Sequence, residues 1–132
     1  MENSKNQNSY LKQHDLLEHA KNPRNYGLFP AYDFISGEHN PSCGDSITIC
    51  GLISNGIVCD VRFEGKGCML SLAMASKLTE FVKEKPVSDI LALDQDIVGQ
   101  LLGIELGPNR IQCGMLSVVA LCSGIMKYQK SL

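Results

Sequence analysis

The sequence predicts one domain, residues 1–132, that combines helices with an antiparallel β-hairpin. Two β-rich runs, residues 47–53 and 57–63, stand on either side of an Asn-Gly pair. Two longer apolar runs, near residues 69–85 and 110–128, have the spacing typical of helices. A chain of 132 residues is long enough to bury an apolar core without disulfides.

The first predicted helix runs from Ser9, a suitable N-cap, to Ala20, and its leucines recur at near-helical spacing. Pro23 follows and ends it, because proline lacks a backbone donor and disfavours helix in the preceding residue. The polar, Asn-rich segment 1–8 is predicted to be disordered. A short edge strand is expected near residues 32–36.

The hairpin is predicted at Asn55-Gly56, because both residues of such a turn must tolerate positive φ. A two-residue loop would place Cys50 opposite Val61. It would place Cys59 opposite Leu52 on the same, buried face. Cys50 and Cys59 would then be diagonal neighbours about 7–8 Å apart, which disfavours a disulfide. We therefore predict that both are core thiols.

The second predicted helix follows Cys68, from Met69 to Lys85, where Pro86 ends it. Further helices are expected at residues 87–93, at 94–102 and from 110 or 111 to 128. This arrangement would place Cys68 and Cys113 at helix N-termini, where free N–H groups and the helix dipole favour the thiolate.

The composition disfavours several classes of function. A net charge of -2 without any block of basic residues offers no field for nucleic acid. No apolar run is expected to approach the roughly 20 residues of a membrane helix. Without a signal or transit segment, six cysteines indicate a reducing cytoplasm, where cysteines more often serve metals or catalysis than disulfides.

Three cysteines lie in separate segments marked by nearby glycines, at residues 40–45, 65–68 and 110–113. Thiolates brought together from distant segments bind zinc, ferrous iron or iron–sulfur clusters. Asp45 adds a carboxylate two residues after Cys43, and Gly44 allows both side chains to face one ion. With Cys68 and Cys113 they would complete a four-ligand site.

Simpler interpretations exist for each segment. Residues 43–45 could be an ordinary turn, residues 65–68 a tight connection, and Cys113 a buried helical cysteine. The glycines at 65 and 67 nevertheless indicate that some group approaches the backbone closely. Cys122, nine residues after Cys113, would lie on the opposite helix face and is predicted to be a core thiol.

The histidines do not predict a hydrolase. His14 and His19 are expected to be solvated or capping residues of the first helix. His39, four residues before Cys43, could approach the site but is expected to be a polar loop residue. No geometry for a Cys–His protease, no P-loop and no dinucleotide fingerprint is recognisable.

From about Leu16 to Tyr128 the chain resembles the U-type iron–sulfur cluster assembly scaffolds, namely IscU, SufU and the N-terminal domain of NifU. The matching motifs are His19, Asn22-Pro23-Arg24-Asn25 with Gly27, Pro41-Ser42-Cys43-Gly44-Asp45, Asp60-Val61-Arg62-Phe63, Gly67-Cys68, Ala75-Ser76, Leu78-Thr79-Glu80 and Arg110-Ile111-Gln112-Cys113 with Leu116.

This resemblance implies an α+β fold, with about three antiparallel strands covered by helices. It implies that Cys43, Cys68 and Cys113 accept sulfur from a pyridoxal-phosphate cysteine desulfurase and, with Asp45 as the labile ligand, bind metal. Such scaffolds build a transient [2Fe-2S] cluster from Fe2+ and pass it to apo iron–sulfur or carrier proteins. Other members hold Zn2+ at the same ligands and relay persulfide sulfur. We therefore expect a scaffold rather than an enzyme, or a sulfurtransferase in the second case.

Two departures bear on the subgroup. Gln112 stands where IscU-type members carry a histidine, and residues 106–110 replace the Leu-Pro-Pro-Val-Lys motif that docks a specialised Hsp70. Docking of that chaperone is therefore not expected. The chain also lacks the long insertion that SufU-type members carry between the second and third cysteines. The mixed pattern favours a SUF-like or chaperone-independent pathway.

Overall fold

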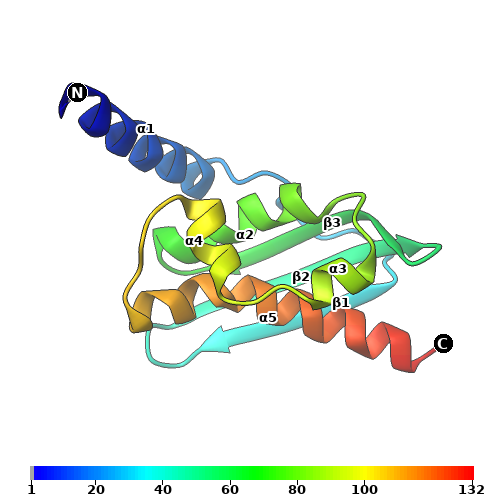
Figure 1. The fold of residues 1–132 in the computed structure, drawn as a ribbon. Coiled ribbons are helices and arrows are strands. Elements are labelled where there is room, and N and C mark those ends of the chain that lie inside the picture. The colour runs from blue at the N-terminus through cyan, green and yellow to red at the C-terminus, as the bar shows by residue number, and fades with distance from the viewer. Residues whose placement is uncertain (1) are drawn as a thin grey trace.

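The computed structural model describes residues 2–132, with side chains from residue 11 onward. Over this range the chain forms a three-stranded antiparallel sheet and five helices (Figure 1). The elements are α1 (Glu2–Lys21), β1 (Phe34–Asn40), β2 (Asp45–Ser54), β3 (Ile57–Lys66), α2 (Met69–Val82), α3 (Val87–Leu91), α4 (Asp96–Leu102) and α5 (Pro108–Lys130). This is the α+β fold that the resemblance implied.

The sheet has the order β1-β2-β3. The predicted hairpin is present, and Asn55 and Gly56 in its turn have φ values of 55° and 73°. The predicted edge strand is also present, but it covers residues 34–40 rather than 32–36. Helix α2 packs against β3 and α5 against β1 and β2, and the core lies between these two helices and the sheet.

The pairing of β2 with β3 differs from the prediction. A register shift between Leu52 and Ile53 places Cys50 opposite Arg62. Such a bulge reverses the alternation of side chains on one side of it. Val58 is therefore buried and Cys59 exposed, so the prediction that Cys59 is a core thiol was wrong. Cys50 is buried as predicted, and all six cysteines are free.

Several helix boundaries also differ, among them the starts of α1 and α5 and the end of α2. Helix α1 begins at Glu2 rather than Ser9, so residues 2–8 are helical where disorder was predicted; they include no glycine or proline to stop a helix. Met1 lies outside the described residues. Helix α2 ends at Val82, before Glu84 with φ 68°. Helix α5 begins at Pro108, a favourable first helical residue.

Helix α5 is long and apolar enough by composition to cross a membrane, which contradicts the expectation that no run was long enough. Its most apolar 18-residue window has a mean hydropathy of 1.4, and 44% of that window is buried inside the protein. Leu116, Leu121 and Ile125 contribute this buried face to the core. The helix therefore serves here as the central core helix of the fold.

Helix α1 is tied to α2 through His19. Its ring is buried, and Nδ1 lies 2.7 Å from the Ser76 hydroxyl. The prediction of a solvated or capping histidine was therefore wrong for His19. The hydroxyl of Ser76 also accepts a hydrogen bond from the backbone N–H of Arg24, which fixes the chain just after α1. The N-terminal end of α1 extends away from the rest of the fold (Figure 1).

Candidate metal centre

The three predicted cysteine segments meet at one end of the sheet. Cys43 lies in the turn between β1 and β2, and Cys68 is the N-cap residue of α2, directly after β3. Because Ser46 pairs with Lys66, the start of β2 lies beside the end of β3. Asp45 is thereby placed next to Cys68. Cys113 reaches the same place from α5, which packs across the sheet.

The carboxylate of Asp45 is held from several directions. It is only 1% exposed, and Oδ1 accepts a hydrogen bond of 3.0 Å from the Cys68 backbone N–H. Oδ2 accepts hydrogen bonds from the Ser71 hydroxyl at 2.5 Å and from the Cys68 thiol at 3.3 Å. Burial raises the pKa of Asp45, but these hydrogen bonds outweigh it and keep the pKa below its ordinary value. The site therefore contains a buried, ionised carboxylate.

Gly67 explains how this carboxylate reaches the backbone. Its φ is 152°, a conformation that disfavours side chains, and a Cβ atom at this position would overlap the carboxylate of Asp45. The close approach predicted from the glycines is thus present, and the approaching group is Asp45. Gly44, between Cys43 and Asp45, also has a positive φ, of 75°, with open space around it.

The ligand atoms of Cys43, Asp45 and Cys113 all lie within 4.8 Å of one another. Within this group the two Sγ atoms of Cys43 and Cys113 are 3.6 Å apart. Cys68 stands beside the group, in contact with the carboxylate of Asp45. The structure therefore brings together all four residues that the sequence selected. The group of three contains no histidine, and His39 lies exposed in β1 rather than in the loop where it was predicted.

The environment of Cys113 disfavours its thiolate. Burial, the hydrogen bond with Cys43, and the negative charges of Cys68, Cys43 and Asp45 raise the pKa of Cys113 to about 12. The expected effect of a helix N-terminus is absent because α5 begins at Pro108. This start leaves Cys113 in the second turn, away from the free N–H groups. A bound cation would reverse the balance by favouring the thiolate.

Ser71 is a site residue that the sequence reasoning missed. It is buried, and its hydroxyl lies within hydrogen-bonding distance of both Asp45 Oδ2 and, at 3.2 Å, the Cys113 carbonyl oxygen. It lies three residues after Cys68, so both face the same side of the first turn of α2. That spacing was the available signal. Ser71 connects β2, α2 and α5 at the centre of the site.

A cavity of 650 Å³ opens beside the thiols. Its lining is mostly apolar and comes from α1, the start of α2, the segment before α5 and the start of α5. The lining residues are Gln13, Leu16, Leu17, Cys43, Cys68, Met69, Leu70, Ile104, Arg110 and Cys113. The three cysteines can therefore be reached by a small molecule or by a segment of a partner protein.

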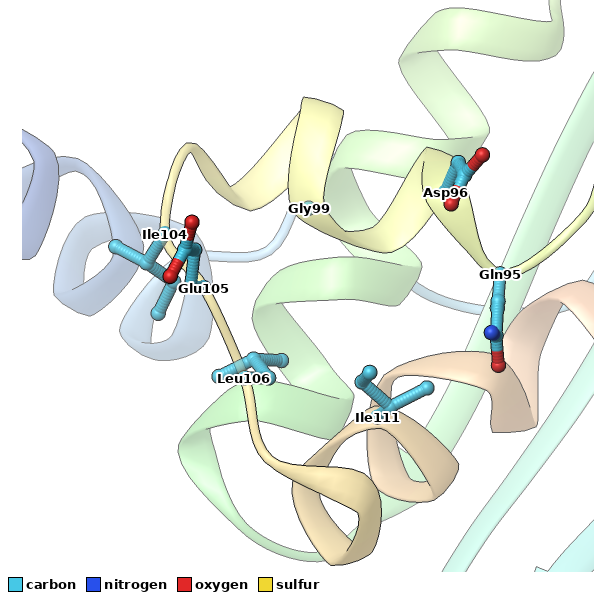
Figure 2. Close-up of a pocket in the computed structure, with 7 residues that line it drawn as sticks. All are labelled: Gln95, Asp96, Gly99, Ile104, Glu105, Leu106 and Ile111. Atoms are coloured by element: carbon cyan, nitrogen blue, oxygen red, sulfur yellow. The ribbon is translucent and has the colours of Figure 1, made fainter.

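A second, smaller hollow lies between α4, residues 103–107 and the start of α5 (Figure 2). Its volume is 290 Å³, and Ile104 lines both hollows, so the two are neighbours. Its charged groups are the exposed carboxylates of Asp96 and Glu105, and no cysteine or histidine lines it. It lacks the soft ligands of the cysteine cluster.

Comparison with known proteins identifies relatives along most of the chain. The family model of the NifU-like N-terminal domain matches residues 11–132. The chain is 33% identical over 129 aligned positions to the zinc-dependent sulfurtransferase SufU of Bacillus subtilis, covering 85% of this chain and 87% of that protein. It is 32% identical over 118 positions to the iron–sulfur cluster assembly scaffold protein IscU of Escherichia coli K12, covering 86% and 91%.

Two solved structures show the same fold. A nitrogen-fixing NifU-like protein (N-terminal) from Brucella abortus superposes with a TM-score of 0.75 at 20% identity, covering 89% of this chain and 94% of that one. An iron–sulfur cluster assembly scaffold protein for the SUF system from Fervidobacterium islandicum superposes with a TM-score of 0.71 at 20% identity, covering 84% and 93%.

Proposed function

The chain belongs to the NifU-like N-terminal domain family, and on that basis we propose that it is a scaffold for iron–sulfur cluster assembly. In this proposal it accepts sulfur from a cysteine desulfurase, assembles a transient [2Fe-2S] cluster and passes the cluster to apoproteins. The relatives named IscU support this role. The cluster is the cargo of the protein rather than a permanent part of it.

The observation that carries the proposal is the convergence of Cys43, Cys68 and Cys113 on the buried carboxylate of Asp45. Three thiols form a soft ligand set suited to iron or zinc. The gap left by Gly67 admits the carboxylate to the same place, so the residues present fit such a group. We propose these four side chains as its ligands.

The four ligands have unequal roles in this proposal. A carboxylate oxygen is a harder ligand than a thiolate and binds iron less firmly, so Asp45 is the ligand to exchange during release. Cys43 lies exposed in a turn, where a sulfur donor can reach it. The apolar cavity beside the thiols gives the donor segment of a desulfurase, or an acceptor protein, a surface to occupy.

We predict that Asp45→Ala slows cluster release. The variant would retain three thiolate ligands while losing the exchangeable one, so a reconstituted cluster should remain bound longer. The measurement is the rate of cluster transfer to an apo-ferredoxin, followed by visible absorbance. Equal transfer rates for the variant and the unaltered chain would contradict the role of Asp45 as the labile ligand.

The direct test of the proposal is anaerobic reconstitution of the metal-free chain with ferrous iron, cysteine and a desulfurase. A [2Fe-2S] chromophore with matching iron and sulfide counts, and its transfer to an apo-ferredoxin, is the expected result. A chain that forms no chromophore under these conditions would contradict the scaffold role.

The second candidate function is zinc-dependent sulfur relay, and two observations favour it. The relative SufU is a zinc-dependent sulfurtransferase, and Gln112 is exposed where IscU-type members carry a histidine. In that role Zn2+ would occupy the same four residues, and the chain would accelerate desulfurase turnover. Tight zinc retention with faster turnover and no chromophore in the reconstitution would identify this function.

Docking of a specialised Hsp70 is not part of either proposal. The segment 106–110 lacks the docking motif, and Pro108, Asn109 and Arg110 form the first turn of α5. A chaperone that binds an extended peptide would have to unwind this turn. We propose instead a partnership with a desulfurase and acceptor proteins alone.

A further inference from the structure

The three cysteines of the site are not equivalent to one another. Cys43 and Cys113 form a close pair, with their Sγ atoms 3.6 Å apart and one thiol in position to donate to the other. The Cys68 thiol is instead directed to Asp45 Oδ2, at 3.3 Å, and lies 3.6 Å from the Ser71 hydroxyl. The site therefore contains a thiol pair and one separate thiol.

We propose that Cys43 and Cys113 act as a resolving pair, in which one thiol releases the sulfur held by the other as sulfide. This inference rests on the proposed function, because it concerns the persulfide that a sulfur acceptor carries. In this step the chain itself reduces the outer persulfide sulfur to sulfide, and Cys43 and Cys113 are the two residues that perform the reduction.

The step can be written with sulfur on Cys43, which is exposed in its turn. The thiol proton of Cys113 passes to the outer persulfide sulfur, and Cys113 Sγ then attacks Cys43 Sγ. The bond between the two persulfide sulfurs breaks, a disulfide joins Cys43 to Cys113, and the outer sulfur leaves as HS⁻ with the bonding electron pair. The outer sulfur is reduced by two electrons, which the two cysteine sulfurs supply together. A dithiol reductant then restores both thiols.

The arrangement of the site favours this pair over any that includes Cys68. Disulfide formation requires the two sulfurs to approach to about 2.05 Å. Cys43 lies in an exposed turn beside Gly44, whose surroundings are open, so its side chain has room to make this movement. The Cys68 backbone N–H is instead fixed to Asp45 at the start of α2.

The test uses a chemical sulfur donor, so that it does not depend on any desulfurase. The metal-free chain is treated anaerobically with inorganic tetrasulfide, desalted, incubated and alkylated with iodoacetamide. Non-reduced peptides are then analysed by mass spectrometry for persulfides and disulfides. The variants are Cys113→Ser, Cys113→Ala, Cys43→Ser and Cys68→Ser, with Cys59→Ser as a control for an exposed cysteine away from the site.

We expect a Cys43–Cys113 disulfide and little remaining persulfide on either residue in the unaltered chain, in Cys59→Ser and in Cys68→Ser. In both Cys113 variants the persulfide on Cys43 should persist at a level about tenfold higher, because the adjacent thiol that removes it is gone. In Cys43→Ser the persulfide should persist on Cys113. Zinc added before the donor should suppress the disulfide, since bound thiolates cannot pair.

Persulfide that persists on Cys43 equally in the unaltered chain and in both Cys113 variants would overturn the inference. Disulfides of Cys68 with Cys43 or Cys113 that are as abundant as the Cys43–Cys113 disulfide would also overturn it. A chain that assembles a cluster with a desulfurase yet keeps its persulfide here would contradict this inference alone. A chain that forms the disulfide here but takes no sulfur from a desulfurase would support the inference and contradict the scaffold proposal.

Discussion

Among single residues, Gly67 and Ser71 decide the position of the Asp45 carboxylate. Gly67 leaves the space that the carboxylate occupies, and Ser71 donates to Oδ2 at 2.5 Å. Neither residue is a proposed ligand. Each can therefore be changed without removing a ligand atom, which makes both suitable probes of the site.

Gly67→Ala should reduce zinc affinity strongly, because the new Cβ would push against the Asp45 carboxylate and so displace Cys68, whose backbone N–H and thiol are hydrogen-bonded to it. The matched control is Gly56→Ala, which also has a positive φ, of 73°, but has nothing within 4 Å of the added atom. Gly56→Ala should lose about 1–2 kcal/mol of stability from backbone strain. Gly67→Ala should lose more, because its Cβ also overlaps the buried carboxylate. Only Gly67→Ala should lose zinc in a competition titration with a chelator. Equal zinc affinity in the two variants would contradict this account of Gly67.

Ser71→Ala should lower the free energy of unfolding of the metal-free chain by about 1.5–3 kcal/mol, the range for a hydrogen bond to a charged group. Because Ser71 helps to lower the pKa of Asp45, the stability from this carboxylate is present at neutral pH. It is lost as the pH falls below the ordinary value near 4. Urea unfolding at several pH values measures both effects, with the exposed Ser54→Ala as control. A variant as stable as this control would contradict the role of Ser71.

The sequence was sufficient to select Cys43, Asp45, Cys68 and Cys113, because three separate segments with nearby glycines each contain a cysteine suited to bind a metal. It was not sufficient to predict that Cys59 is exposed, because this exposure depends on a β-bulge that the residues of the turn do not predict. Ser71 was missed because its importance comes from contacts with β2 and α5, which are distant in sequence.

Among the elements, the attachment of α1 to α2 is expected to depend on pH. The His19 ring is buried between these helices, and its Nε2 atom faces the carboxylates of Asp15 and Glu80 at 3.7 and 3.8 Å. Lys77 on α2 forms an ion pair with Asp15. Burial lowers the pKa of His19, with a further lowering by Arg24 and Lys77 that Asp15 and Glu80 oppose.

Because the folded-state pKa of His19 is lowered, the unfolded chain binds the proton more readily, and stability rises with pH through this range. Stability should therefore fall as the pH drops below the ordinary histidine value of about 6.5. In His19→Gln this dependence should become shallower, whereas the exposed His39→Gln should retain it. Urea denaturation between pH 5 and pH 8 would measure the slopes, since this interval spans the titration of histidine. An unchanged slope in His19→Gln would contradict the assignment.

The elements themselves were mostly predictable, and their ends were less so. The hairpin follows from Asn55-Gly56, and the helices follow from their apolar periodicity. Helix α2 begins at Met69 as predicted. The start of α5 is less marked in sequence, because its N-cap residue, Gly107, forms no side-chain capping hydrogen bond. The shorter α2 likewise reflects the left-handed conformation of Glu84, which is unusual for this residue type.

In the whole molecule, the site exists because an antiparallel sheet and the helices on it bring three segments of the chain to one end of the sheet. The spacing of Cys43, Cys68 and Cys113 along the sequence contains no information about this meeting. It follows from the pairing of β2 with β3 and from the packing of α5 across β1 and β2. These contacts are tertiary, so the agreement of three separate segments, supported by the family resemblance, suggested one shared site, whereas its geometry could not be predicted from the sequence.

The central claim is that Cys43, Cys68 and Cys113, and no other cysteines, form the metal centre. The most direct test is the zinc or iron content of six single Cys→Ser variants, purified alike and measured together with protein concentration. Replacement of these three should reduce bound metal sharply. Replacement of Cys59, which is exposed, and of Cys50 and Cys122, which pack in or beside the core, should leave one site per chain occupied. Full metal content in any of the first three, or its loss in Cys59→Ser, would contradict the account.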